Sequence, residues 1–515
     1  MLARAQLRTV PWRSLLWAAI ACAAGVAIYV MPLSTALLVL TLAILIVLSL
    51  IDTRIALFVT LVIGPLKILT ETEVPLAREL PIDIGQIAFF ATLGIWVVRS
   101  IAMRQQMFPR WSPIYLPLIL FLVAVSFSLW NSAAPLSTIK ELVQFAEILV
   151  IAALVVSLME PGNLGWIVAA LIASGVVQAL IGIYEFRGGS GAPSLWILDF
   201  HYFRAFGSFG QPNPFGAFMG LILALSLGCT FGWVAEIFKN LTPCPPLRSR
   251  RGETWWQRVS LATRLQVSQP LAIFLVLLFA DTILAIGLLV SWSRGAWIGF
   301  SGAALILLFF APKRRLIGAI LVVLLIGGTA FMFATGLAPA SLVARASDFT
   351  QELVGYTDVR GAQISDANYA VLERLAHWHA AIDMATDNPW IGIGFGAWDA
   401  AYPRYALMNW PTGLGHAHNF YLNVLAETGV IGLIGYLAAC VMIFVLTMRV
   451  LNQESGFRRG VALGILGVWG HLAVHSVFDK LFVNNLPLHL GVMLGLIGGL
   501  LIYRWHNDGY SRSGN

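Results

Sequence analysis

Charged residues are scarce in this sequence. Asp, Glu, Lys and Arg make up 11% of the 515 residues, whereas hydrophobic residues make up 59%. Because soluble domains carry roughly 25% charged residues, this composition excludes an ordinary soluble domain. The net charge of +7 does not indicate nucleic-acid binding either, since the basic residues lie in loops between apolar runs and form no basic face.

Cysteine and nucleotide-binding signatures are also sparse. The four cysteines, Cys22, Cys229, Cys244 and Cys440, form no CxxC or Cys/His pattern, so neither a disulfide framework nor a zinc site is predicted. The segment WIGIGFGAW, residues 390–398, has glycines in a GxGxG spacing with no surrounding βαβ unit. It therefore does not predict a dinucleotide site, and we interpret it as a turn that docks the preceding loop on the membrane.

Long apolar runs are abundant. A helix needs about 20 predominantly apolar residues to cross a bilayer, and such runs recur from 14–31 and 33–51 to 460–478 and 486–503. They predict an all-α polytopic membrane protein, with about 12–14 transmembrane helices and a large extracytoplasmic loop. The first run has no clear small-residue cleavage site, so we predict a retained span and not a signal peptide.

The distribution of basic residues predicts the orientation. Lys and Arg concentrate in cytoplasmic loops, and here they recur in every second loop after the arginines at the N-terminus. This pattern places both termini and a linker, 236–269, in the cytoplasm, and the loops 185–213 and 336–429 outside. It requires the apolar runs 270–291 and 295–311 to be separate helices, because one continuous helix would invert everything that follows.

Two outward-facing clusters contain an arginine beside an apolar run. Arg204 lies in HYFRAFGSFGQPNPFGAF, and Arg294 lies in SWSRGAWIGF, at the break between two runs. Arginines at such places serve as interfacial anchors or stop charges, or they are functional. A third cluster, HAHNFYLNVLAETGVIGL, contains His416 and His418. Either histidine can cap a helix end, or act as a general base near neutral pH.

The external loop 336–429 is too long to be a simple connector. Within it, residues 367–386 show the i, i+4, i+7, i+11 apolar pattern of a helix, which ends at Asn388-Pro389. Arg374 and Trp378 lie on this helix and either reach the site or only pack. After the loop, Glu427 and Gly429 are predicted to mark a short helix and its break.

Together these clusters resemble the O-antigen ligase/polymerase superfamily of membrane glycosyltransferases. The resemblance covers about residues 200–480 in family order, and its most specific part is the HN…ETGxxGL segment. The motifs are Arg204 with Gly207 and Pro212-Asn213, then Ser293-Arg294-Gly295, then the external helix with Asn388-Pro389, then His418-Asn419 with Gly429. The implied domains are 1–184, N-terminal transmembrane helices; 185–480, the ligase-like catalytic region; and 481–515, the last transmembrane helix and a cytoplasmic tail.

The resemblance implies a GT-C-like membrane fold. It also implies a metal-independent enzyme without a cofactor, in a bacterial inner membrane, with its site on the extracytoplasmic face. The donor would be a glycan on a polyprenyl diphosphate, and the acceptor a glycan or glycolipid. Arg204 and Arg294 would hold the diphosphate, because guanidinium binds phosphate oxygens bidentately, and His418 would be the general base. The implied substrate-binding residues are His416, Asn419, Asn213, Arg374 and Trp378.

Alternatives remain open from sequence. Glu147 and Asp281 lie inside predicted spans, as expected for a transporter of a small anion such as bicarbonate. No mirrored helix breaks of the inverted-repeat kind accompany them, and the Arg, His and aromatic residues gather in external loops. A non-catalytic scaffold has no specific support. The sequence does not distinguish a ligase from a polymerase.

Overall fold

The protein is described here from a computed structural model. It describes residues 25, 47–73, 82–104, 109–160, 162–188, 195–197, 201–241, 255–338, 343, 359–365 and 368–512. Almost all of the predicted spans 14–31 and 33–51 lie outside these residues, as do 242–254 of the predicted linker and most of 339–358 in the external loop.

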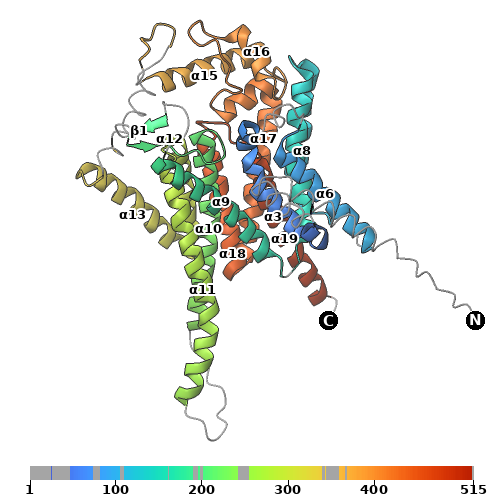
Figure 1. The fold of residues 1–515 in the computed structure, drawn as a ribbon, viewed down its shortest axis with the longest axis vertical. Coiled ribbons are helices and arrows are strands. Elements are labelled where there is room, and N and C mark those ends of the chain that lie inside the picture. The colour runs from blue at the N-terminus through green and yellow to red at the C-terminus, as the bar shows by residue number, and fades with distance from the viewer. Residues whose placement is uncertain are drawn as a thin grey trace, which may run out of the picture.

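The described part of the chain is a helical bundle with one very short β-ribbon (Figure 1). Its elements are α3 (Thr53–Ile63), η1 (Gly64–Leu66), α4 (Lys67–Glu73), α6 (Ile84–Ala102), α7 (Tyr115–Ser126), η2 (Phe127–Asn131), α8 (Pro135–Leu158), α9 (Leu164–Gly188), β1 (Trp196–Ile197), β2 (Tyr202–Phe203), α10 (Pro212–Leu241), α11 (Trp255–Val290), α12 (Arg294–Phe310), α13 (Arg315–Ala334), α15 (Tyr369–Asp387), α16 (Trp398–Tyr405), α17 (Phe420–Gln453), α18 (Gly456–His475) and α19 (Leu486–Arg512).

Seven helices in the described ranges are long and apolar enough to cross a membrane, and four further apolar helices are shorter. The chain is therefore an all-α polytopic membrane protein, as the sequence predicts. The total of about 12–14 spans stays a prediction. Helices α10 and α11 extend into both ends of the predicted linker 236–269. At 36 residues, α11 is about 54 Å long, and its lower end projects beyond the bundle (Figure 1).

The predicted break between the apolar runs is confirmed. Helix α11 ends at Val290 and α12 begins at Arg294, and Trp292 between them has a positive φ of 52°. The Ser293 hydroxyl caps α12 by accepting from the Ala296 backbone N–H at 3.4 Å. Because the two runs are separate helices, the orientation predicted for everything downstream keeps its basis.

Helices α10 and α18 cross closely at the centre of the bundle. A Cβ on Gly228 would lie 2.2 Å from the Gly464 nitrogen, and one on Gly232 would lie 2.9 Å from the Gly460 Cα. Glycines four residues apart on both helices therefore let the two backbones touch, which is the usual device for membrane helices that gain nothing from the hydrophobic effect on association. This contact fixes α18, whose last residue lies at the site.

The segment predicted to be external, residues 336–429, packs on a broken helix. Helix α15 confirms the predicted helix 367–386 to within a few residues, and α15 and α16 lie together at one end of the bundle (Figure 1). Within α17, Gly429 adopts φ 65° and ψ −168°, so the predicted break is also present. The WIGIGFGAW turn docks there: the Gly394 N–H donates to the Glu427 carbonyl at 2.9 Å, and the Ile431 N–H to the Trp390 carbonyl at 3.2 Å.

Candidate active site

Arg204 is positioned by the β-ribbon. Strands β1 and β2 pair antiparallel, with Trp196 opposite Phe203, and the Arg204 N–H extends the ribbon by donating to the Leu195 carbonyl at 2.8 Å. The next N–H, of Ala205, donates to the Val290 carbonyl at 3.0 Å, which ties the ribbon to the end of α11. This tie brings Arg204 close to the start of α12, where Arg294 lies.

The N-termini of α10 and α12 meet at the same place. Asn213 is the second residue of α10 and Arg294 the first of α12. The Ser293 hydroxyl donates to the Asn213 side-chain oxygen at 2.9 Å, so the two helix starts are joined. Helix N-termini carry partial positive charge and unpaired N–H groups. Two of them side by side, with arginines added, favour an anion.

These residues line a small polar cavity of about 90 Å³. Three arginines converge on it: Arg204 from the ribbon, Arg294 from α12 and Arg374 from the external helix α15. Its full lining is Arg204, Asn213, Arg294, Gly295, Ala370, Arg374, His475, Phe478 and Asp479, and we call it the arginine pocket. The structure thus brings together four of the predicted site residues, including Arg374, for which the sequence left a purely structural role open.

Both histidines of the HAHN segment face one carboxylate, Asp479. The His416 Nε2 lies 3.5 Å and the His418 Nδ1 3.8 Å from the same Asp479 Oδ1, and the two ring centroids are 4.4 Å apart. From sequence the two rings need not act together, whereas here they form one cluster. His418 has a positive φ of 53°, a strained conformation for a non-glycine residue. Asp479 also lines the arginine pocket, so it joins the histidines to the arginines.

The two rings differ in their available nitrogens. His416 Nδ1 accepts the His418 backbone N–H at 3.0 Å, so its proton lies on Nε2, towards Asp479. In His418, neither ring nitrogen has a hydrogen-bond partner within the described residues. With a proton on Nδ1 directed at Asp479, the His418 Nε2 is left as an unoccupied acceptor. An imidazole oriented by a carboxylate, with its other nitrogen free of hydrogen bonds, is the arrangement of a general base.

Burial and neighbouring charges separate the protonation states of this cluster. Burial lowers the pKa of His416 to about 3, although the Asp479 charge opposes the shift. Burial favours neutral Asp479, yet the contacts with His418 and His416 outweigh it and lower the pKa of Asp479 below its usual value. Near neutral pH the site therefore contains a charged carboxylate beside an uncharged His416.

A buried ion pair holds the loop that carries Asp479. The neighbouring Lys480 donates from Nζ to the Glu141 Oε1 at 2.8 Å, and both side chains are at most 14% exposed. Burial alone would lower the pKa of Lys480, but the charges of Glu141 and Glu427 raise it. Glu427 in turn accepts the Trp398 backbone N–H at 3.2 Å. The loop after α18 is thus tied to α8, α17 and the external segment.

Sequence reasoning missed Asp479, because it follows an apolar run and resembles an ordinary span end. Asn419, predicted to bind substrate, caps α17 by accepting the Leu422 N–H at 3.1 Å. Trp378 is not among the residues that line the arginine pocket. Substrate binding by these two residues stays a prediction. His416 follows a Gly-Leu-Gly stretch, yet its hydrogen bond fixes the ring.

The two candidates for a transport role lie elsewhere. Glu147 accepts the Gln86 side-chain amide at 3.0 Å, and Asp281 accepts the Thr230 hydroxyl at 2.6 Å. Each bond joins two helices, and neither acid lines the arginine pocket or the apolar groove described below. The two acids therefore lie apart from the candidate site.

One ligand atom each from His416, His418 and Asp479 lies within 4.8 Å of the other two. Two imidazoles and a carboxylate at this spacing are also a set that divalent transition metals can use. The resemblance implies metal independence, which stays a prediction that chelation tests.

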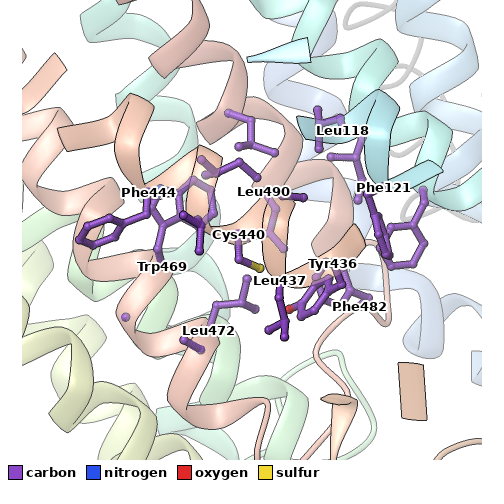
Figure 2. A pocket seen from close by; sticks show the side chains of 18 of the residues that line it. Leu118, Phe121, Tyr436, Leu437, Cys440, Phe444, Trp469, Leu472, Phe482 and Leu490 are labelled. Atoms are coloured by element: carbon purple, nitrogen blue, oxygen red, sulfur yellow. The ribbon is translucent and has the colours of Figure 1, made fainter. Parts of the chain in front are cut away.

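An apolar groove lies among the helices of the bundle (Figure 2). Its volume is about 380 Å³, and its walls come from α7, α8, α12, α17, α18 and α19. Figure 2 shows Cys440 in the middle of its wall, among Leu437, Leu472 and Leu490. Tyr421 and Phe482, which follow the site residues within a few positions, also line it. Exposed side chains of α17 border the groove, among them Val441, which is 62% exposed.

The fold and the site together define a polytopic membrane protein with a pocket lined by arginines and a histidine. Residues 279–437 match the family model described as O-antigen ligase, which confirms the predicted resemblance and supports a membrane glycan ligase or polymerase in general terms. The matched segment contains Arg294, α15, His416 and His418, whereas Arg204 and Asp479 lie outside it. No curated protein matches the chain.

Proposed function

We propose that the protein transfers a glycan from a polyprenyl-diphosphate carrier to an acceptor hydroxyl at the extracytoplasmic face of the membrane. The observation that carries this proposal is Asp479, which joins the three-arginine pocket to the histidine pair. A multiply charged leaving group and a general base are the two requirements of this transfer, and the site places groups suited to both beside one carboxylate.

The proposed transfer uses no metal or cofactor. The acceptor oxygen attacks the anomeric carbon of the glycan, and the bond from that carbon to the diphosphate oxygen breaks. The acceptor proton goes to the His418 Nε2, and Asp479 stabilises the imidazolium. The electron pair leaves with the diphosphate, where Arg204, Arg294 and Arg374 stabilise the growing charge. Arginine suits this role because its charge is permanent and its fork binds two oxygens.

The proposed side of the membrane rests on charge and topology. Lys313 and Arg314 lie between α12 and α13, and Arg315 is the first residue of α13, all at the opposite end of α12 from Arg294. By the positive-inside rule that basic loop is cytoplasmic, which puts the arginine pocket outside. A lipid-linked donor at the outer leaflet then presents its diphosphate at the membrane surface and its polyprenyl chain to the bilayer.

Transfer by the purified protein tests the proposal. With a polyprenyl-diphosphate glycan and its acceptor, we expect product to form at the same rate with and without EDTA. In right-side-out vesicles, a glycan acceptor that cannot cross the membrane should be modified without disrupting the vesicle. No transfer from any lipid-diphosphate donor would reject the enzyme. Loss in EDTA that Zn²⁺ or Mn²⁺ restores would assign the His416, His418 and Asp479 cluster to a metal.

We further propose that the apolar groove holds part of the donor's polyprenyl chain, because residues close in sequence to the site line it and its wall is mostly apolar. Filling it by Cys440→Trp is then expected to raise the KM for a long-chain donor about tenfold. The KM for a donor with a chain too short to enter should stay unchanged. The matched control is Val445→Trp on the same helix, at a 57% exposed position outside the groove. Equal effects on both donors would exclude the chain from the groove.

A further inference from the structure

The arginine pocket has a wall that the proposed mechanism does not use. His475, the last residue of α18, lines the pocket together with the three arginines. Its side chain is completely buried, and its Nε2 has no hydrogen-bond partner within the described part of the chain. A buried polar atom without a partner is costly and rare in folded proteins, so this nitrogen calls for an explanation.

The fold makes room for this ring at the pocket. A Cβ on Gly295 would lie 2.9 Å from the His475 Nε2, and one on Gly299 would lie 2.7 Å from the His475 Cβ. Only glycines at these two positions of α12 let α18 place an imidazole there. The first of them directly follows Arg294, so Nε2 lies beside the arginine that is proposed to bind the leaving group.

The other nitrogen of His475 is engaged by a second histidine. The His471 Nε2 lies 3.2 Å from the His475 Nδ1, one helical turn along α18. The His471 ring is also completely buried, and a Cβ on Gly220 of α10 would lie 2.2 Å from it. The His471 Nδ1 has no partner within the described residues. The two rings thus form a chain that starts in the bundle core and ends at the pocket.

The tautomers of this chain follow from what the pocket must bind. One proton lies between the two rings, so exactly one of the facing nitrogens donates. If His471 Nε2–H donates, His475 Nδ1 accepts, and the His475 proton lies on Nε2 and points into the pocket. The opposite assignment would present an acceptor lone pair to a phosphate oxygen and repel it. An anion in the pocket therefore selects the first assignment.

We propose that His475 is a phosphate-binding residue of this site, donating from Nε2 to a diphosphate oxygen, and that His471 is a positioning residue which holds the donating tautomer. The proposal rests on the proposed function, since it deepens the assignment of the pocket to a diphosphate. His475 supplies a neutral donor between charged ones, and its position on α18 is independent of the external helix that carries Arg374.

Replacing His475 by Asn or Gln tests whether a hydrogen-bond donor is needed at the position of its Nε2. The Gln side-chain nitrogen reaches about as far as the imidazole Nε2, whereas the Asn nitrogen stops near Nδ1. We measure binding of farnesyl diphosphate to the full-length protein in detergent by calorimetry. His475→Asn is expected to weaken binding roughly 10–100-fold, the loss of one hydrogen bond to a charged group. His475→Gln should stay within about threefold of the wild type, a rescue that a purely packing role would not produce.

A second pair of variants tests whether His471 holds the donating tautomer of His475. Neither variant changes a residue that lines the arginine pocket. His471→Gln keeps a donor to His475 Nδ1, and His471→Leu removes it at similar size. We expect the Leu variant to weaken farnesyl diphosphate binding several-fold and the Gln variant to leave it near the wild-type value. The melting temperature without ligand reports whether each variant is folded. Should His475→Asn fail to fold, the His471 pair decides the question.

The outcomes separate this inference from the proposed function. If the wild-type protein binds no farnesyl diphosphate, the pocket is no diphosphate site and the proposed function falls with it. If the wild type binds and the folded His475→Asn variant binds equally well, the inference is rejected while the proposed function stands. Equal weakening by Asn and Gln at position 475 would reduce His475 to a packing residue and would also reject the inference.

Discussion

Replacing His418 by alanine is expected to lower the rate of glycan transfer by ~10²–10⁴-fold, the usual contribution of a general base. Replacing His416 by alanine is expected to lower it much less. The difference follows from which ring nitrogens of the two histidines are already engaged by other groups. His416 uses Nδ1 to accept the His418 backbone N–H and directs Nε2 at Asp479, so no nitrogen remains for a substrate proton. In His418, by contrast, Nε2 has no hydrogen-bond partner within the described residues.

His416 is nevertheless expected to have a measurable effect. Its hydrogen bond supports the backbone of His418, which has a positive φ of 53°. Without the ring, that strained backbone loses one of its supports, and the base moves. A small displacement of a catalytic group is costly because proximity depends on its geometry. We therefore expect a loss of about tenfold for His416→Ala, mainly in kcat.

The measurement is single-turnover transfer by purified protein, with donor binding determined separately. His379→Ala is the matched control, since His379 lies on α15 outside the arginine pocket and the Asp479 contacts. It should retain the wild-type rate. Equal losses in the His416 and His418 variants would mean that the two rings share the role. An active His418→Ala protein would remove the base from the mechanism.

Local features of this chain follow from its sequence. The helix break before Arg294, the external helix and the kink at Gly429 are all present. Each is encoded within a few residues, by a capping serine, by an apolar repeat or by a glycine that can take a positive φ. The two arginines and two histidines named from motifs also lie at one site, although the roles of these residues stay predictions.

The sequence does not show which residues from distant parts of the chain meet at the site. Asp479 is about 60 positions from the histidines that it contacts, and nothing near it in the chain distinguishes it from a charge at the end of a span. His475 and His471 lie inside an apolar run, where a lone histidine is usually a satisfied core residue. Only the crossing of α18 with α10 and α12, allowed by glycines on all three helices, places these side chains beside the arginines.

The arginines carry the second large effect. Arg204 and Arg294 reach the pocket from different elements. Arg204 directly follows β2, and Arg294 is the first residue of α12. Each is anchored through its own backbone: the ribbon by hydrogen bonds to Leu195 and Val290, and α12 by its Ser293 cap. Because the two anchors are independent, replacing one guanidinium should leave the other in place.

Arg204→Lys and Arg294→Lys are each expected to lower transfer by roughly 10–100-fold, although charge is kept. Lysine ends in a compact ammonium, which cannot reproduce two parallel N–H bonds to a diphosphate. Arg404→Lys is the matched control, because its side chain is 78% exposed and pairs with Asp387 at 3.5 Å on the outer surface. The assay compares kcat/KM at equal membrane levels.

If both pocket variants keep the wild-type kcat/KM, these arginines are interfacial anchors. If only kcat falls while donor binding is unchanged, they act on the departing diphosphate alone. The proposed mechanism predicts that both donor binding and kcat fall, because the arginines hold the diphosphate before transfer and stabilise the charge that grows on the leaving oxygen as its bond to the anomeric carbon breaks.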